Sequence, residues 1–225
     1  MGLLPSPPEY PVSLFPRRRP PNWILIIASL GCTMTVLETN AVAVALPTIA
    51  RDLQADFADI EWVISCYILT FTSLLLPAGA IADRHGRRRV LLIGIALFAL
   101  SSLTCALAPT ASALYVARAL QGVGAAFLLA PSLSVIGHEF HEGKQRDDAW
   151  AFWGTAMGMM MVLSPLIGGL LSSLWGWRSV FIAILPFLAF LAYGAIRWVP
   201  ATADTVVRPL DPPGIITFSA AIFGI

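Results

Sequence analysis

The sequence has few charged side chains. Aspartate, glutamate, lysine and arginine make up 12% of its 225 residues, whereas about a quarter of an average soluble domain is charged. Hydrophobic residues account for 57% of the chain. This composition excludes an ordinary soluble domain and predicts an integral membrane protein.

The sequence also has few cysteines and histidines, and its net charge is small. The three cysteines lie in apolar runs without paired spacing, which argues against a disulfide framework or a metal site. His138 and His141 belong to a polar segment without a second ligand cluster, so a solvated loop is favoured over a metal site. The net charge of +1 gives no reason to expect a nucleic-acid partner.

The apolar runs contain no nucleophile and base pair and no His-Glu-x-x-His motif, so the sequence predicts neither an enzyme nor a cofactor.

Six apolar runs are long enough to cross a hydrocarbon core of about 30 Å as helices. The runs cover about residues 23–46, 60–82, 90–108, 113–137, 149–175 and 180–199. We expect Pro47 to end the first helix, Pro131 to kink the fourth, and Pro186 to lie inside the sixth. The sequence therefore predicts an all-α membrane protein with a bundle of six transmembrane helices over residues 23–199.

Polar segments separate and flank these runs. Residues 51–61 are expected to form a net acidic loop, and residues 138–148 a polar loop on the other side of the membrane. Residues 1–22 contain seven prolines and predict a disordered cytoplasmic tail. Residues 200–213 predict a cytoplasmic linker. Residues 214–225 begin another apolar helix that is too short to span, so we expect the truncated start of a seventh span, with a natural half-length protein as the alternative.

The basic residues are unevenly distributed over the connections. With residues 84–89 on the cytoplasmic side, eleven basic residues lie inside and only Arg51 and Arg178 lie outside. Lysine and arginine favour the cytoplasmic side of short loops. The bias predicts a multi-pass protein of the inner (plasma) membrane with a cytoplasmic N-terminus. The remaining basic residue, Arg118, lies inside the fourth apolar run.

Two glycines and an arginine recur at the same spacing in the two halves of the bundle. The first set follows the second run and the second set follows the fifth: Gly79, Gly86 and Arg88, then Gly169, Gly176 and Arg178. Such internal similarity is expected of transporters built from inverted repeats. The spacing supports six helices built as two triplets. In a transporter of this kind the triplets would be two inverted three-helix repeats, and the first and fourth helices would face the substrate path.

The segment GAIADRHGRRR, residues 79–89, resembles the signature loop between helices 2 and 3 of the major facilitator superfamily of transporters. The matching positions are Gly79, Ala82, Asp83, Arg84, Gly86, Arg87, Arg88 and Arg89. A generic cytoplasmic loop would need the positive charge but neither the acid nor the glycines. In that family the loop belongs to the cytoplasmic gate, and the resemblance implies a gating role for Gly79, Asp83, Arg84, Gly86, Arg87 and Arg88.

Two further motifs place charges inside the spans. LETNAVAVALPTI, residues 37–49, resembles the first-span motif of the fourteen-span drug/proton antiporters, with Glu38 where aspartate is usual and Ala43 where asparagine is usual. ARALQGVGAA, residues 117–126, is similar to the family's arginine-containing motif and includes Arg118 and Gln121. Glu38 and Arg118 lie at similar depths, so an ion pair is possible. A functional pair is favoured over a static one because charges within membranes usually mark ion or proton paths.

The fifth run resembles the antiporter motif, a glycine-rich helix that neighbours can approach closely. The matching residues are Gly154, Gly158, Pro165, Gly168 and Gly169. Two further positions where the motif has glycine hold Met160 and Ser164. An ordinary small-residue helix interface is therefore as good an interpretation as an antiport device.

Together these motifs imply the N-terminal half of a proton-coupled exporter of drugs or other amphipathic compounds. Its partners would be a small-molecule substrate, protons, the lipid bilayer and a C-terminal half, with Glu38, Arg118 and Gln121 on the proton or substrate path. The alternative is a six-helix membrane protein that does not transport but binds or regulates another protein. Coding sequence for further spans beyond residue 225 would favour the transporter.

Overall fold

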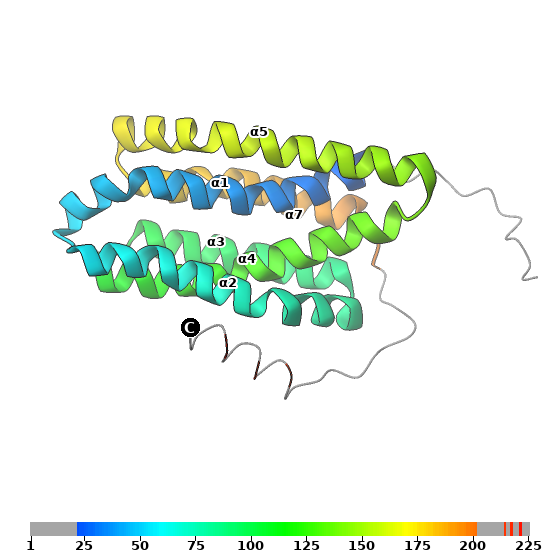
Figure 1. Ribbon diagram of the computed structural model, residues 1–225, viewed down its shortest axis with the longest axis horizontal. Helices are drawn as coiled ribbons and strands as arrows, with labels where there is room; N and C mark the ends of the chain where they lie inside the picture. The colour runs from blue at the N-terminus through cyan, green and yellow to red at the C-terminus, as the bar shows by residue number, and fades with distance from the viewer. Residues whose placement is uncertain (1–21, 202–213, 215–216, 218–220, 222–225) are drawn as a thin grey trace, which may run out of the picture.

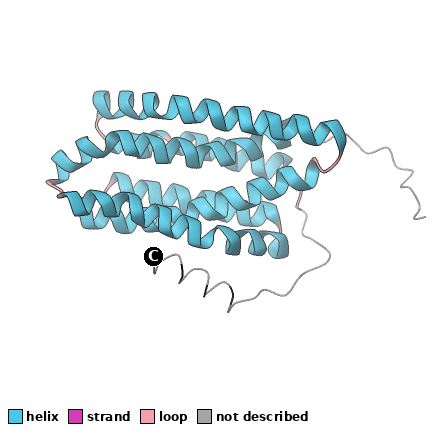
Figure 2. Cartoon of the chain, viewed as in Figure 1, coloured by secondary structure: helices cyan, strands magenta, loops and turns pink. Residues whose placement is uncertain are grey.

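The computed structural model describes residues 22–201 together with Gly214, Thr217 and Ala221. Within these residues the regular structure is entirely helical (Figure 2). The helices are α1 (Asn22–Leu53), α2 (Phe57–His85), α3 (Arg87–Ala106), α4 (Ala111–Glu139), α5 (Gly143–Trp175), α6 (Arg178–Ala183) and α7 (Leu185–Trp198). Counting α6 and α7 together, six helices are long and apolar enough to cross a membrane, which confirms the predicted number.

The first helix is longer than expected because Pro47 does not end it. α1 continues through Pro47 to Leu53. A proline removes one hydrogen-bond donor from a helix but does not prevent tertiary contacts from holding the turns beyond it. Here Ile49 is fully buried, and the Thr48 hydroxyl accepts a hydrogen bond of 3.3 Å from Ser172 of α5.

The two predicted polar loops are mostly helical, so both predictions were wrong in extent. Only residues 54–56 connect α1 to α2, and only residues 140–142 connect α4 to α5. Asp56 caps α2 by accepting from the Asp59 amide at 2.8 Å, while the Asp59 carboxylate accepts from the Asp56 amide. This reciprocal capping lets a helix begin inside an acidic segment.

The other two prolines lie in α4 and α7. Pro131 lies inside α4, which runs unbroken along its length. Pro186 was expected inside a single sixth helix, but the helix breaks at Ile184 and Pro186 occupies the first turn of α7. The amides of a first turn have no partner within the helix, so proline is tolerated there.

The helices form two layers. Figure 1 shows α5 and α1, with α7 behind them, above a second layer of α2, α3 and α4. The most extensive contacts lie within the layers, between α2 and α4, α3 and α4, and α1 and α5. Contacts of α1 with α4 and of α3 with α6 and α7 join the layers, whereas α1 and α2 barely touch. Glu38 and Arg118 therefore belong to different layers.

Glycines bring the helices of each layer close together. A Cβ added to Gly122 of α4 would lie 2.5 Å from the Tyr67 carbonyl oxygen of α2, and one added to Gly124 would lie 2.6 Å from the Phe98 amide nitrogen of α3. In the other layer, a Cβ on Gly168 of α5 would lie 2.5 Å from the Ala41 Cα of α1. Close backbone approach through small residues is the usual packing mode of membrane helices.

The two ends of the bundle each carry a glycine with a left-handed backbone. At the first, here called the Gly86 end, Gly86 alone separates α2 from α3 and has φ 97°. At the opposite end, here called the Gly176 end, Gly176 follows α5 and has φ 80°. The loop expected within residues 79–89 is thus one residue long. Figure 1 shows the two connections at opposite ends, as inverted repeats require.

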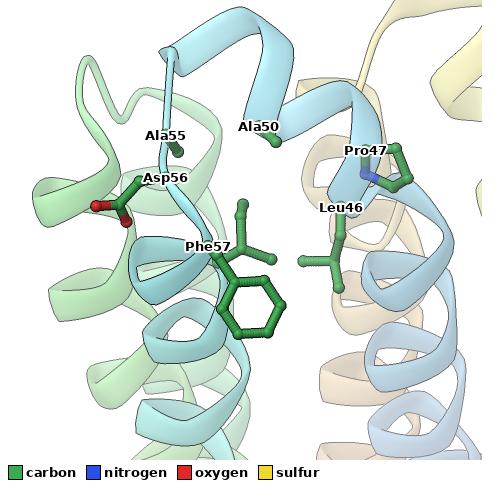
Figure 3. Close-up of a pocket in the computed structure, with 7 residues that line it drawn as sticks. Leu46, Pro47, Ala50, Ala55, Asp56 and Phe57 are labelled. Carbon is green, nitrogen blue, oxygen red and sulfur yellow. The ribbon is translucent and has the colours of Figure 1, made fainter.

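A small apolar pocket opens between α1 and α2 at the Gly176 end. Its volume is about 280 Å³, and its lining residues are Leu46, Pro47, Ala50, Ala55, Asp56, Phe57 and Ile60. In Figure 3 the Phe57 ring and the Leu46 side chain face the space, while the Asp56 carboxylate points away from it. The pocket lies about two helical turns from Glu38 along α1 and is separate from the buried charges.

Several predictions fall outside the described residues. These are the tail over residues 1–21, the linker over residues 202–213, and most of the seventh span over residues 214–225. Asn22, the last residue of the expected tail, is the first residue of α1.

Candidate functional site

The centre of the bundle holds a buried ion pair between the two layers. Glu38 projects from α1 and Arg118 from α4, and the Arg118 Nη1 donates to the Glu38 Oε1. Glu38 is 1% exposed and Arg118 is 2% exposed. The structure thus brings together the two intramembrane charges that the sequence placed at similar depth.

A chain of hydrogen-bonded polar side chains extends from this pair through α4 to α3. The Arg118 Nη1 also donates to the Gln121 Oε1 at 2.7 Å, and the Gln121 Nε2 donates to the Ser102 hydroxyl at 2.8 Å. Gln121 and Ser102 are completely buried. Because buried polar groups are costly unless they are hydrogen-bonded, this chain fixes the guanidinium in one orientation.

The α2 helix supplies two uncharged contacts to the same guanidinium. The Arg118 Nε donates to the Val63 carbonyl oxygen at 3.2 Å, and the Arg118 Cζ lies 4.1 Å from the centre of the Tyr67 ring. Tyr67 in turn stacks on Phe71, with ring centres 5.9 Å apart. An aromatic face attracts a cation most strongly where water is absent.

The two members of the pair are unequally satisfied. Arg118 has four contacts, from Glu38, Gln121, Val63 and Tyr67. The second carboxylate oxygen of Glu38, Oε2, has no hydrogen-bond partner within the described residues. An ionised carboxylate in such a place is stabilised almost entirely by the arginine. Glu38 therefore depends on Arg118 as its counter-ion, whereas Arg118 has three further contacts.

A second cluster lies at the Gly86 end and joins three helices. The Asp83 Oδ1 of α2 accepts from Arg87 of α3, with Nε at 3.2 Å and Nη2 at 3.1 Å, and from the Ser134 hydroxyl of α4 at 2.9 Å. The Arg87 Nε also donates to the Ser134 Oγ at 2.7 Å. Arg87 is 5% exposed. This cluster ties the ends of one layer together around Gly86.

The other predicted residues of the arginine-rich segment play no part in these contacts. Arg84 is exposed and Arg88 is half-buried. Gly79 lies inside α2, where an added Cβ would make an ordinary contact of 3.9 Å with Ala130.

The predicted antiporter-like glycines divide into two groups. Gly168 is buried against α1, and Gly169 lies near Val44, where an added Cβ would be 3.5 Å from the Val44 Cγ1. An added Cβ at Gly154 or Gly158 would meet nothing within 4 Å among the described residues. Pro165 lies between the two groups and is half-buried.

A third polar cluster, at the Gly176 end, was not predicted as a site. The Asp52 Oδ2 of α1 accepts from the Trp177 Nε1 at 2.9 Å and from the Arg178 Nη1 at 2.5 Å. The Arg178 Nη2 donates to the Ala108 carbonyl oxygen at 3.2 Å. The recurrence of glycine and arginine at residues 176 and 178 was a sequence signal for it. The contacts of Ser102, Ser134 and Tyr67 had no such signal, because they depend on helix packing.

A buried acid and arginine inside six membrane-length helices define a multi-pass membrane protein with an intramembrane polar site. Comparison with known proteins identifies its family. A sequence model described as the Major Facilitator Superfamily matches residues 24–222. The chain belongs to this superfamily, as its motifs predicted.

Two bacterial relatives are similar over most of the chain. The methylenomycin A resistance protein of Streptomyces coelicolor is 38% identical over 207 residues, which are 92% of this chain and 43% of that protein. The multidrug efflux pump LfrA of Mycolicibacterium smegmatis is 36% identical over 86% of this chain and 39% of that protein. This chain therefore spans less than half the length of these relatives.

A solved structure shows the same fold. The structure of the peptide transporter POT in complex with sulfate matches with a TM-score of 0.70 at 18% sequence identity, over 90% of this chain and 43% of that chain. Together with the six membrane-length helices, these comparisons establish a multi-pass membrane protein. Members of the superfamily are transporters. The comparisons therefore support, at the level of the family, the expectation that the chain is not an enzyme.

Proposed function

We propose that this chain forms the N-terminal six-helix half of a proton-coupled exporter of drugs or other amphipathic organic compounds. The names of the relatives support the proposal, since one is a resistance protein and another an efflux pump. The observation that carries it is the buried pair of Glu38 and Arg118 between the two layers. Ionisable groups in the middle of membrane helices most often serve ion or proton transport.

Glu38 is the proton-coupling group in this proposal. As a carboxylate it is held by Arg118; as a neutral acid it no longer needs a counter-ion, and its contact with α4 weakens. A proton reaches a carboxylate oxygen of Glu38 from one side of the membrane and leaves to the other side after the helices have moved. Gln121 stays with Arg118 and keeps the guanidinium hydrogen-bonded in both states.

The Gly86 end faces the cytoplasm in this proposal, in accordance with the positive-inside bias. Asp83, Arg87 and Ser134 then form part of the cytoplasmic gate, with Gly86 as the connection between α2 and α3. The exposed arginines, Arg84 among them, lie in the aqueous phase or near lipid headgroups, where they help to keep this end inside.

The free face of α5 is the surface on which we place the C-terminal half. Gly154 and Gly158 are one helical turn apart on this face and leave room for the backbone of another helix. Gly168 fixes α5 to α1, so α1 and α5 would move together against the proposed C-terminal half.

The test uses full-length protein reconstituted in liposomes with a pH difference across the membrane. Glu38→Gln should abolish proton-driven substrate movement while leaving the protein inserted and folded. Glu38→Asp keeps the charge with a shorter reach and should retain part of the activity. Uphill, pH-driven transport by the Glu38→Gln protein would remove Glu38 from the coupling role.

A further inference from the structure

The Arg118 guanidinium is bound from one layer of the bundle far more than from the other. Its contacts to Val63, Tyr67 and Gln121 all come from α2 and α4. Glu38 is the contact that α1 provides. The site is therefore asymmetric, with the cation fixed in one layer and the anion brought to it by the other.

The layer that binds Arg118 is tightly built at this level. Gly122 follows Gln121 on α4, and an added Cβ there would lie 2.5 Å from the Tyr67 carbonyl oxygen and 3.1 Å from the Phe71 amide nitrogen. Val63, Tyr67 and Phe71 recur at four-residue intervals along one side of α2, and the Phe71 ring stacks on the Tyr67 ring. Such backbone contact leaves α2 and α4 little freedom to slide past each other.

The contacts of Arg118 other than Glu38 are all electrically neutral. A carbonyl oxygen, an amide oxygen and an aromatic face can stabilise a buried guanidinium without taking its proton. They remain available when Glu38 is protonated or withdrawn. Glu38 has no equivalent support, since its Oε2 lacks a partner in the described part of the chain.

We propose that Tyr67 is a positioning residue that keeps Arg118 in place when the ion pair opens, so that Glu38, carried by α1, is the partner that moves. This inference rests on the proposed proton coupling for its purpose in the transport cycle, but its physical content is a property of the folded protein. The ring has its greatest effect in the state where Glu38 no longer balances the cation. In the closed pair the ring adds less, because Glu38 provides the larger stabilisation.

The test is a double-mutant cycle on purified full-length protein in detergent, with the melting temperature as the readout. Tyr67→Leu and Tyr67→Phe are each made with Glu38 and with Glu38→Gln, which imitates the protonated acid. Tyr115→Leu serves as the matched control, because Tyr115 is a partly buried tyrosine of α4 with no ring contact to Arg118.

We expect Tyr67→Leu to lower the melting temperature about twice as much in the Glu38→Gln protein as in the protein with Glu38, because the cation then loses its remaining aromatic contact. Tyr67→Phe keeps the ring and should restore the melting temperature in both backgrounds. Tyr115→Leu should have the same effect in both. Equal losses of melting temperature from Tyr67→Leu in the two backgrounds would show that the ring only packs. A loss from Tyr67→Phe as large as that from Tyr67→Leu would assign the effect to the hydroxyl. Either result overturns the proposal.

The double variant with Glu38→Gln and Tyr67→Leu could fail to fold, and a third substitution keeps that result informative. Adding Arg118→Met removes the cation while preserving a long apolar stem, so folding should return if an unsupported guanidinium was the cause. Failure of this triple variant to fold would contradict the proposal. None of these outcomes depends on transport, so the proposal can fail while the coupling role of Glu38 stands, and the reverse also holds.

Discussion

The close contact of α2 and α4 at Gly122 gives a prediction with a calculable size. In Gly122→Ala, the new Cβ would lie 2.5 Å from the Tyr67 carbonyl oxygen, whereas ordinary contacts begin at 3.4 Å. α2 must therefore retreat by about 1 Å or distort. Repacking of this kind typically costs about 1–3 kcal/mol.

The retreat also reaches the charged site. Val63 and Tyr67 lie on the part of α2 that must move, and the bond from the Arg118 Nε to the Val63 carbonyl is already 3.2 Å long. A further shift of about 1 Å would break it, because hydrogen bonds weaken steeply beyond about 3.5 Å. Loss of a hydrogen bond to a charged group costs roughly 1.5–3 kcal/mol. We therefore expect Gly122→Ala to destabilise the folded protein by about 3 kcal/mol.

Gly137 on the same helix provides the matched control. An added Cβ at Gly137 meets nothing within 4 Å among the described residues. Both substitutions gain the same intrinsic helix preference of alanine over glycine, roughly 1 kcal/mol, so this gain cancels in the comparison. The difference between the two variants isolates the clash.

The free energy of unfolding can be measured by titrating the full-length protein in mixed micelles with sodium dodecyl sulfate. Gly137→Ala should be neutral or stabilising, and Gly122→Ala should unfold at clearly lower denaturant. If the two variants unfolded at the same denaturant concentration, α2 would not be packed on α4 as described. The placement of Val63 and Tyr67 beside Arg118 would then also be wrong.

Three further predictions concern the ends of the bundle. In intact cells and without the native cysteines, Arg84→Cys should resist an impermeant thiol reagent while Ala58→Cys reacts with it; the reverse pattern would invert the proposed orientation. Asp83→Asn keeps an oxygen acceptor but loses the charge, so it should reduce transport more than the melting temperature, and unchanged transport would argue against a gate role. Asp52→Ala removes the acceptor of the buried Trp177 Nε1, so amide exchange at residues 176–184 should become faster than in the unsubstituted protein; unaltered exchange there would show that this cluster does not hold the Gly176 end.

The number of helices was predictable because the membrane imposes a length and a composition that the chain displays directly. The helix ends were less predictable. Polar residues at 51–61 and 138–148 suggested loops, but helices continue into water when capping or tertiary contacts satisfy their ends. Asp56 and Asp59 illustrate this, since the acids that suggested a loop are those that begin α2.

The charged site was partly predictable for a similar reason. A lone glutamate and a lone arginine within apolar runs are conspicuous, and counting residues along each helix gives their depth. Depth alone does not say which neighbours surround them. Tyr67 is an unremarkable residue in the sequence, since aromatic side chains are common in membrane helices. The position of the Tyr67 ring over Arg118 depends on the rotation of α2 about its own axis. That rotation is set by the close packing of the α2 backbone against Gly122.

The same packing is consistent with the proposed opening of the pair of charges. A buried ion pair whose partners shared one rigid element would be static, because its separation would require local unfolding. Here the arginine is held within the layer of α2, α3 and α4, while Glu38 belongs to α1, which packs through Ala41 against Gly168 of α5. In the proposed cycle, movement between the layers would change the distance between the charges without breaking the helix contacts inside either layer. The small pocket lies on the same boundary, between α1 and α2, which make few contacts with each other.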